Sequence, residues 1–153
     1  MRHRLIGAGI LAISLLLVSA CASRPPPTML RIALVAGAGV NPDMNGRASP
    51  IVVKLYELKS LTAFNGADFF SLFEKDKDAL GTELVGREDL QLRPTENRTI
   101  ERKIQSETRY FGVVAAFRDL DRARWRAAAA VPEHKTTPVT IRIEARSISI
   151  QTK

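Results

Sequence analysis

RYFGVVAAF, residues 109–117, carries the clearest strand signal in the chain. After Arg109 the segment is apolar or small at every position, so neither face of a strand formed here would be polar. Strands of that kind are buried on both faces, whereas a strand with one exposed face alternates apolar and polar residues. The segment is therefore predicted to be a central strand.

Six further segments on either side of it are also predicted to be strands, because they are rich in apolar and β-branched residues and bounded by turn signals. They cover residues 30–36, 51–59, 82–92, 98–105, 124–127 and 138–150. The run around Trp125 is ambiguous, since its alanines favour a helix. Pro132 and the strand-rich surroundings favour a strand, which we prefer. In the last segment Val139, Ile141 and Ile143 should face the core.

Residues 60–80 change to a helical period after the second strand. Asp68 can cap a helix whose Phe69 and Phe73 lie one turn apart, and Gly81 can end it. The phenylalanines of this segment are expected to fix the helix onto the core, the alternative being an aromatic ligand cage. Seven short strands with one helical insertion predict an all-β, two-sheet β-sandwich formed by residues 30–153.

The segment GAGVNPDMNGRASP, residues 37–50, separates the first two strands and reads as a loop because of its glycines, prolines and asparagines. Loops of this length inside a compact domain are usually functional or disordered. Val40 and Met44 are apolar groups in a segment that should face water. Met44 and Arg47 are candidate anchors for a protein partner, since both residue types are enriched at interface cores. The alternative for Met44 is a loop methionine without a partner.

The N-terminus has the layout of a cleaved signal peptide, residues 1–20. Arg2 and Arg4 precede an apolar run that is shorter than a membrane span and closed by small residues. The run ends at Cys21, the only cysteine of the chain, in the pattern Leu-x-Ser-Ala-Cys. This pattern resembles the bacterial lipobox, in which the cysteine is acylated before cleavage. The alternative is that Cys21 is an ordinary residue beside a standard cleavage site.

Residues 21–29 would then form a lipidated, proline-rich tether. The run Pro25-Pro26-Pro27 favours an extended conformation that would hold the domain about 25 Å from the lipid, unless the segment is a disordered leader. The net charge is +7, or +5 without Arg2 and Arg4. Because the basic residues are spaced singly and the chain is exported, we interpret them as a solvated face and expect no nucleic-acid partner.

The sequence lacks the residues that catalysis or metal binding requires. After the signal segment the single histidine is His134, in a polar loop between two prolines. No set of cysteines and histidines could bind zinc, and Gly37-Ala38-Gly39 lacks the lysine of a phosphate loop. We expect no enzyme activity, no cofactor and no small-molecule substrate.

Four features in their order resemble one family: the lipobox, IVVKLYELK, ADFFSLFEKDKDAL and YFGVVAAFRDLDRARWR. Together they are similar to the type VI secretion lipoproteins of the TssJ (SciN/VasD) family. The resemblance implies a transthyretin-like β-sandwich, anchored through Cys21 to the periplasmic face of the outer membrane. Ala22 supports that destination, because it is not the aspartate that retains many lipoproteins at the inner membrane.

In that family the loop between the first two strands binds the periplasmic C-terminal region of the TssM-type inner-membrane component. By position, the resemblance places partner binding on Asn41, Pro42, Asp43, Met44, Asn45, Gly46 and Arg47. Two other readings remain open. One is a pilotin-like lipoprotein that assembles a different envelope pore, and the other is a periplasmic hydrolase that uses surface carboxylates.

Overall fold

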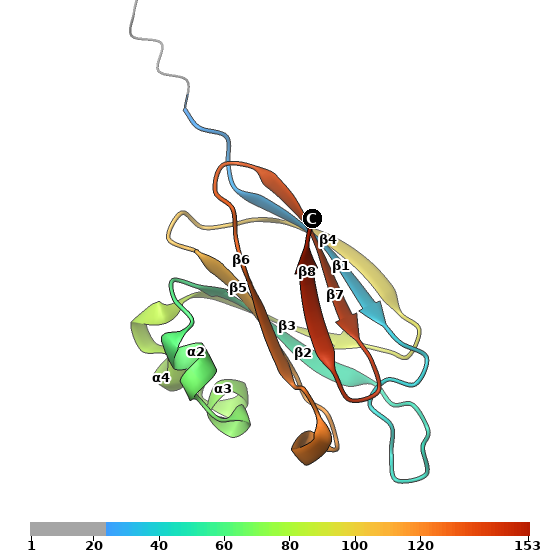
Figure 1. The fold of residues 1–153 in the computed structure, drawn as a ribbon. Helices are drawn as coiled ribbons and strands as arrows, with labels where there is room; N and C mark the ends of the chain where they lie inside the picture. The colour runs from blue at the N-terminus through green and yellow to red at the C-terminus, as the bar shows by residue number, and fades with distance from the viewer. Residues whose placement is uncertain (1–23) are drawn as a thin grey trace, which may run out of the picture.

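The computed structural model describes residues 24–153, which form two four-stranded sheets packed face to face (Figure 1). The first sheet has the strand order β4-β1-β7-β8 and the second the order β3-β2-β5-β6. The strands are β1 Met29–Ala36, β2 Ile51–Leu58, β3 Leu84–Leu92, β4 Asn97–Lys103, β5 Tyr110–Ala115, β6 Arg126–Ala130, β7 Thr136–Ile143 and β8 Ile148–Thr152. The all-β sandwich is confirmed. The predicted signal peptide and Cys21 lie outside the described residues.

The strand β5 lies inside its sheet, as its sequence predicted. It pairs antiparallel with β2 on one side and with β6 on the other. Phe111 and Val113 point into the core between the two sheets, whereas Val114 packs on the opposite face, beneath the helices. A strand covered on both sides has no position for a polar side chain, which explains its apolar sequence.

The other inner strand that matters for the site is β1. It pairs antiparallel with β4 and parallel with β7. The core between the sheets is built from alternate residues of these strands, and Ile32 and Leu34 are fully buried there. The strand β1 begins at Met29, at one end of the sandwich, and ends at Ala36, at the opposite end.

The sequence prediction was wrong on the number of strands. Residues 138–150 form a hairpin, β7 and β8, rather than one strand, so the total in the described residues is eight. The turn is closed by the amide of Glu144, which donates to the carbonyl of Ser147 at 2.8 Å. The core-facing positions Val139, Ile141 and Ile143 are buried as predicted. The run after Trp125 is a strand, and the 3₁₀ helix Gly81–Glu83 precedes β3 where a strand was expected.

Three short helices cover the outer face of the second sheet (Figure 1). They are α2 Thr62–Gly66, α3 Phe69–Glu74 and α4 Asp76–Leu80. Asp68 caps α3 as predicted, accepting the amide of Ser71 at 2.9 Å. Gly81 ends α4 with a φ of 51°, which glycine adopts without strain.

The phenylalanines of the insertion divide into two groups. Phe64 and Phe69 are buried, and Phe73 stacks on Phe69 with ring centres 5.1 Å apart. Phe70 is 61% exposed, so the expectation that all four fix the helices to the core was wrong for this residue. Within residues 24–153 no helix is both long enough and apolar enough to cross a bilayer.

Candidate functional site

The β1–β2 loop, residues 37–50, starts and ends where the sequence predicted, directly between Ala36 and Ile51. Its base is tied to the sandwich. The amide of Gly37 donates to the carbonyl of Ile143 at 2.8 Å, and the amide of Ser49 donates to the carbonyl of Val40 at 3.0 Å. Val40 is fully buried in the core, so the expectation that it faces water was wrong. The loop is therefore rooted in the domain.

Asn41 locks the base of the loop. Its side chain is 3% exposed and its φ is 48°, in the left-handed region that asparagine tolerates. Its amide group donates to the carbonyl of Pro50 at 2.9 Å, and its side-chain oxygen accepts the amide of Arg118 at 2.8 Å. Asn41 belongs to the predicted partner-binding set, and the structure places its side chain inside the loop.

Asp43 organises the tip of the loop. One carboxylate oxygen accepts the backbone amides of Asn45 and Arg47, both at 2.9 Å. The other accepts Nε of Arg47 at 2.8 Å, and the backbone amide of Asp43 donates to the carbonyl of Arg47 at 2.8 Å. Gly46 turns the chain with a φ of 76°. These bonds close residues 43–47 into a small ring.

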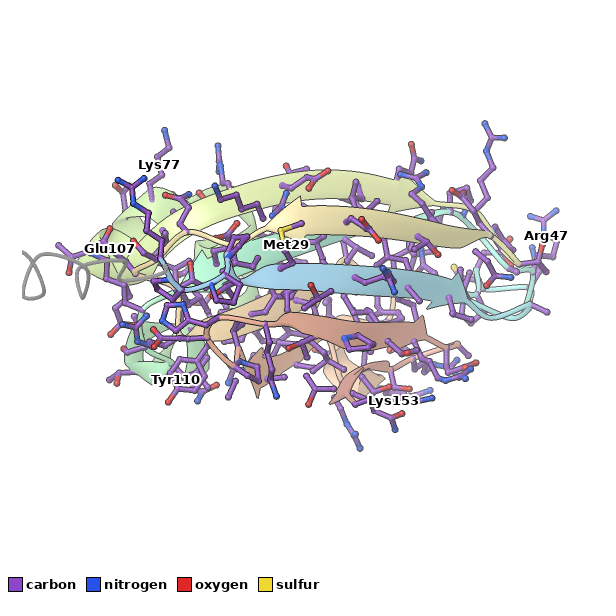
Figure 2. All side chains as sticks on the ribbon, turned by 90° about the horizontal axis from the view of Figure 1, so that it is seen from above. Met29, Arg47, Lys77, Glu107, Tyr110 and Lys153 are labelled. Carbon is purple, nitrogen blue, oxygen red and sulfur yellow. The ribbon has the colours of Figure 1, made fainter. Side chains whose placement is uncertain are left out.

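The ring presents its side chains outward. Met44 is 104% exposed, and Asn45, Gly46 and Arg47 are exposed as well. Pro42 is half-buried beside them. Arg47 lies at the far end of the strands from the start of β1 (Figure 2). An apolar side chain held fully in water by an ordered loop is suited to entering a pocket on another molecule.

A shallow depression of about 570 Å³ adjoins the ring. It is lined by Pro42, Asp43, Met44, Asn45, Arg118, Asp119 and Arg146. Sequence reasoning did not select the last three residues. The signal available was the charged turn at residues 118–122, but its contact with the loop depends on the bond from Asn41 to Arg118, which follows from the folded structure alone.

Three arginines and two aspartates surround the tip, so it carries a small excess of positive charge. Arg47 and Arg118 are exposed, and Arg146 is bound to Asp119 at 2.9 Å. The backbone amide of Arg47 holds the pKa of Asp43 below its usual range, and the guanidinium of Arg47 acts in the same direction. Asp43 is therefore ionised at neutral pH and keeps its hydrogen bonds to the ring.

The features of this site suit binding rather than catalysis. His134 lies elsewhere, in the loop before β7, where its amide donates to the hydroxyl of Thr28 at 2.9 Å. Across residues 24–153 no group of three or more histidine, cysteine, aspartate or glutamate side chains could hold a metal ion. The loop tip offers one apolar side chain and several cations on a rigid base.

Comparisons with known proteins concern the family and the fold of this chain. Residues 28–146 match the family model of the type VI secretion lipoproteins, described as VasD, EvfM and TssJ. That family is one of secretion lipoproteins, not of enzymes. No match to a curated protein was found.

Solved structures share the fold. The lipoprotein TssJ1 of Pseudomonas aeruginosa is 44% identical, with 84% of this chain and 98% of that chain covered and a TM-score of 0.81. Lip of Serratia marcescens, a membrane-bound component of the type VI secretion system, is 25% identical over 83% of this chain and 98% of that chain, with a TM-score of 0.76. A structure described as the TssM C-terminal domain from EAEC matches 81% of this chain and 98% of its own at 20% identity and a TM-score of 0.68, which shows the fold alone.

Proposed function

This chain belongs to the type VI secretion lipoprotein family, and from that membership we propose that it anchors a trans-envelope secretion complex to the outer membrane. Cys21 carries the lipid, on the periplasmic face. The β1–β2 loop binds the periplasmic C-terminal region of the TssM-type inner-membrane component. The protein thereby links the two membranes without catalysing a reaction.

The lipid anchor is supported by the sequence pattern at residues 17–21. An apolar run preceded by arginines and closed by Leu-Val-Ser-Ala-Cys fits export followed by acylation. Two or more acyl chains hold a protein stably at a bilayer. Residues 1–20 are then the signal peptide, residues 21–29 the tether with its lipidated cysteine, and residues 30–153 the working domain.

Partner binding is supported above all by one observation, the fully exposed Met44 on a ring closed by Asp43. Five hydrogen bonds within residues 43–47 order the tip before any partner arrives. An ordered loop loses less conformational entropy on binding, which raises its affinity. The partner is expected to offer an apolar pocket for Met44, with carboxylates near Arg118 and Arg146.

The decisive experiment is a titration of the purified chain against the periplasmic C-terminal region of the TssM-type component. Replacing residues 42–46 by a short Gly-Ser link should leave the circular dichroism spectrum unchanged and abolish binding. Phe70→Ala is the matched control, because within residues 24–153 it removes the other exposed large apolar side chain, on α3 and away from the loop. Unchanged affinity of the loop variant would contradict the proposal.

The anchor is tested separately by Cys21→Ser. We expect loss of palmitate labelling, loss of the protein from outer-membrane fractions and loss of secretion. Recovery of the variant in outer-membrane fractions with secretion intact would contradict the assignment of Cys21.

A further inference from the structure

The start of β1 is bound to the loops on both sides of it. The carbonyl of Thr28 accepts the amide of Ile104 at 2.9 Å, and its hydroxyl accepts the amide of His134 at 2.9 Å. Nδ1 of His134 lies 3.3 Å from the carbonyl of Pro26. Because that carbonyl can only accept, the ring nitrogen donates. The chain is thus fixed to the sandwich from residue 26 onward.

Four residues lie between Cys21 and Pro26, so the two Cα atoms are five chain steps apart. However these residues are arranged, they span about 18 Å at most. Given a lipid on Cys21, which is part of the proposed function, this end of the sandwich stays within about 18 Å of the bilayer. The free spacer is therefore shorter than the 25 Å tether that the sequence suggested.

The same end carries an excess of basic side chains. Lys103 and Lys135 flank Met29: Lys103 is its partner in β4, and the carbonyl of Lys135 accepts the amide of Met29 at 3.0 Å. Both lysines are exposed, and neither has a carboxylate within 4.0 Å among residues 24–153. Arg24 is exposed as well and precedes Pro26 by two residues.

Two ion pairs lie on the same surface and leave its net charge positive. Lys59 binds Glu107 at 2.7 Å, and Arg109 binds Glu133 at 2.7 Å. Five basic side chains therefore stand against two acidic ones, around the point where the chain leaves the domain. We call this surface the tether collar; its basic members are Arg24, Lys59, Lys103, Arg109 and Lys135.

We propose that the tether collar binds the headgroups of anionic phospholipids. An anionic bilayer attracts basic side chains within about one Debye length, which is about 8 Å at physiological ionic strength. The short spacer keeps the collar close to the charged surface of the bilayer. A protein that diffused freely would not stay there. Lys103 and Lys135 contribute most, because no carboxylate of the domain neutralises them.

Binding at the collar sets the orientation of the domain. Glu107 lies toward one end of the molecule and Arg47 at the other (Figure 2). The eight residues of β1 connect these ends and extend about 26 Å. With the collar on the bilayer, the β1–β2 loop points away from the membrane and toward the periplasm.

Vesicle partitioning of the chain from Cys21 onward, carrying Cys21→Ser, tests the collar without any lipid anchor. Vesicles contain phosphatidylcholine alone or with phosphatidylglycerol. We expect binding only to the anionic vesicles, reduced by salt, and lowered roughly tenfold or more by the double variant Lys103→Gln/Lys135→Gln. The matched control is Arg122→Gln/Arg142→Gln, which removes two exposed charges outside the collar.

Orientation is tested by coupling Cys21, the only thiol, to a maleimide lipid in the same vesicles. Trp125 is the only tryptophan. It pairs with Ala115, at the end of β5 opposite the collar. Energy transfer from Trp125 to a headgroup acceptor should be weaker on anionic than on neutral vesicles. The collar variant should abolish that difference, and the control should keep it.

Either of two results overturns the inference: equal losses in the collar and control variants, or partitioning that ignores lipid charge. Neither vesicle experiment requires acylation in the cell or the secretion partner. A failure here therefore leaves the anchor and loop assignments standing, and a failure of those assignments is detected by labelling and titration.

Discussion

Three hydrogen bonds join Asp43 and Arg47 and close the tip of the β1–β2 loop: the carboxylate of Asp43 accepts the backbone amide of Arg47 at 2.9 Å and its Nε at 2.8 Å, and the amide of Asp43 donates to the carbonyl of Arg47 at 2.8 Å. An exposed ion pair alone adds little. Here the same carboxylate also holds backbone amides, so it fixes the path of the chain. The shape that Met44 presents to a partner depends on this one side chain.

Asp43→Ala is expected to weaken partner binding roughly threefold to tenfold, because the loop must then be ordered during binding. Asp43→Asn keeps an acceptor for the amides and should lose less. The melting temperature should not change in either variant, since the tip is exposed. Calorimetric titration measures the affinity, and equal affinities for all three proteins would exclude an ordering role.

Met44→Ala should reduce affinity by roughly fivefold to thirtyfold, as expected for an apolar anchor at the centre of an interface. Met44→Leu keeps the apolar volume and should retain most of the binding. Chemical denaturation should give wild-type stability for both, because the side chain of Met44 is fully exposed. A Met44→Ala variant that binds as wild type would assign the interface to other residues.

Asn41→Ala should lower the free energy of unfolding by about 1–3 kcal/mol, because it leaves the carbonyl of Pro50 and the amide of Arg118 without partners. Asn41→Gly tolerates the φ of 48° but loses the same hydrogen bonds. Comparing the two variants in urea separates backbone strain from hydrogen bonding. If Asn41→Gly lowers the free energy of unfolding as much as Asn41→Ala does, the whole effect comes from the lost hydrogen bonds.

Asp76 joins the helical insertion to the second sheet. It is 2% exposed, is hydrogen-bonded by Arg87, and lies 3.6 Å from Nζ of Lys54. Burial raises the pKa of Asp76, but the hydrogen bond and charge of Arg87 and the charge of Lys54 outweigh it and hold the pKa below 3.8. Asp76→Asn should destabilise the fold by about 3 kcal/mol, since it removes the buried carboxylate that neutralises Arg87 and Lys54 and leaves Lys54 with only the more exposed Asp89, at 3.5 Å.

The pH dependence of stability follows from the same lowered pKa. An aspartate has an ordinary pKa of 3.8. The contribution of Asp76 to the free energy of unfolding is fully present above that pH and is lost as the pH falls through the lower pKa of the folded state. Urea denaturation between pH 6 and pH 2 should show a steeper acid loss in the wild type than in Asp76→Asn. Parallel curves would show that Asp76 is not linked to unfolding.

Tyr56→Phe tests the second contact beneath the helices. The buried hydroxyl of Tyr56 donates to the carbonyl of Leu72 in α3 at 2.7 Å, and burial raises the pKa of this phenol. Its loss should cost about 1–2 kcal/mol and speed amide exchange in α3. Exchange rates that rise equally in β5 would indicate a global rather than a local effect.

Much of the fold could be predicted because hydrophobic patterning reports burial directly. The apolar run of β5 identified an inner strand, and the composition of residues 37–50 identified the loop with its limits. The hairpin of β7 and β8 was missed, because the four residues between them contain neither glycine nor proline. The exposure of Phe70 was missed because the sequence was interpreted as one helical segment, whereas the structure divides it into the three short helices α2, α3 and α4.

The site was less predictable than the fold, because it depends on contacts between distant segments. Val40 and Asn41 lie in a segment whose composition is that of an exposed loop. Val40 nevertheless enters the core, and Asn41 is hydrogen-bonded to Arg118. The depression that includes Arg146 forms only when the β7–β8 turn meets the β1–β2 loop. Asp43 is part of the predicted set, but its role in closing the tip depends on the left-handed turn at Gly46.

The position of β1 has a mechanical consequence. Under the proposed anchoring, tension between the lipid and the inner-membrane partner enters the domain at Met29 and leaves at Ala36, along the axis of one strand. β1 is flanked by β4 and β7, whose hydrogen bonds run across that axis. Pulling therefore shears two ladders at once instead of peeling them bond by bond, and the domain should resist extension far better than its thermodynamic stability suggests.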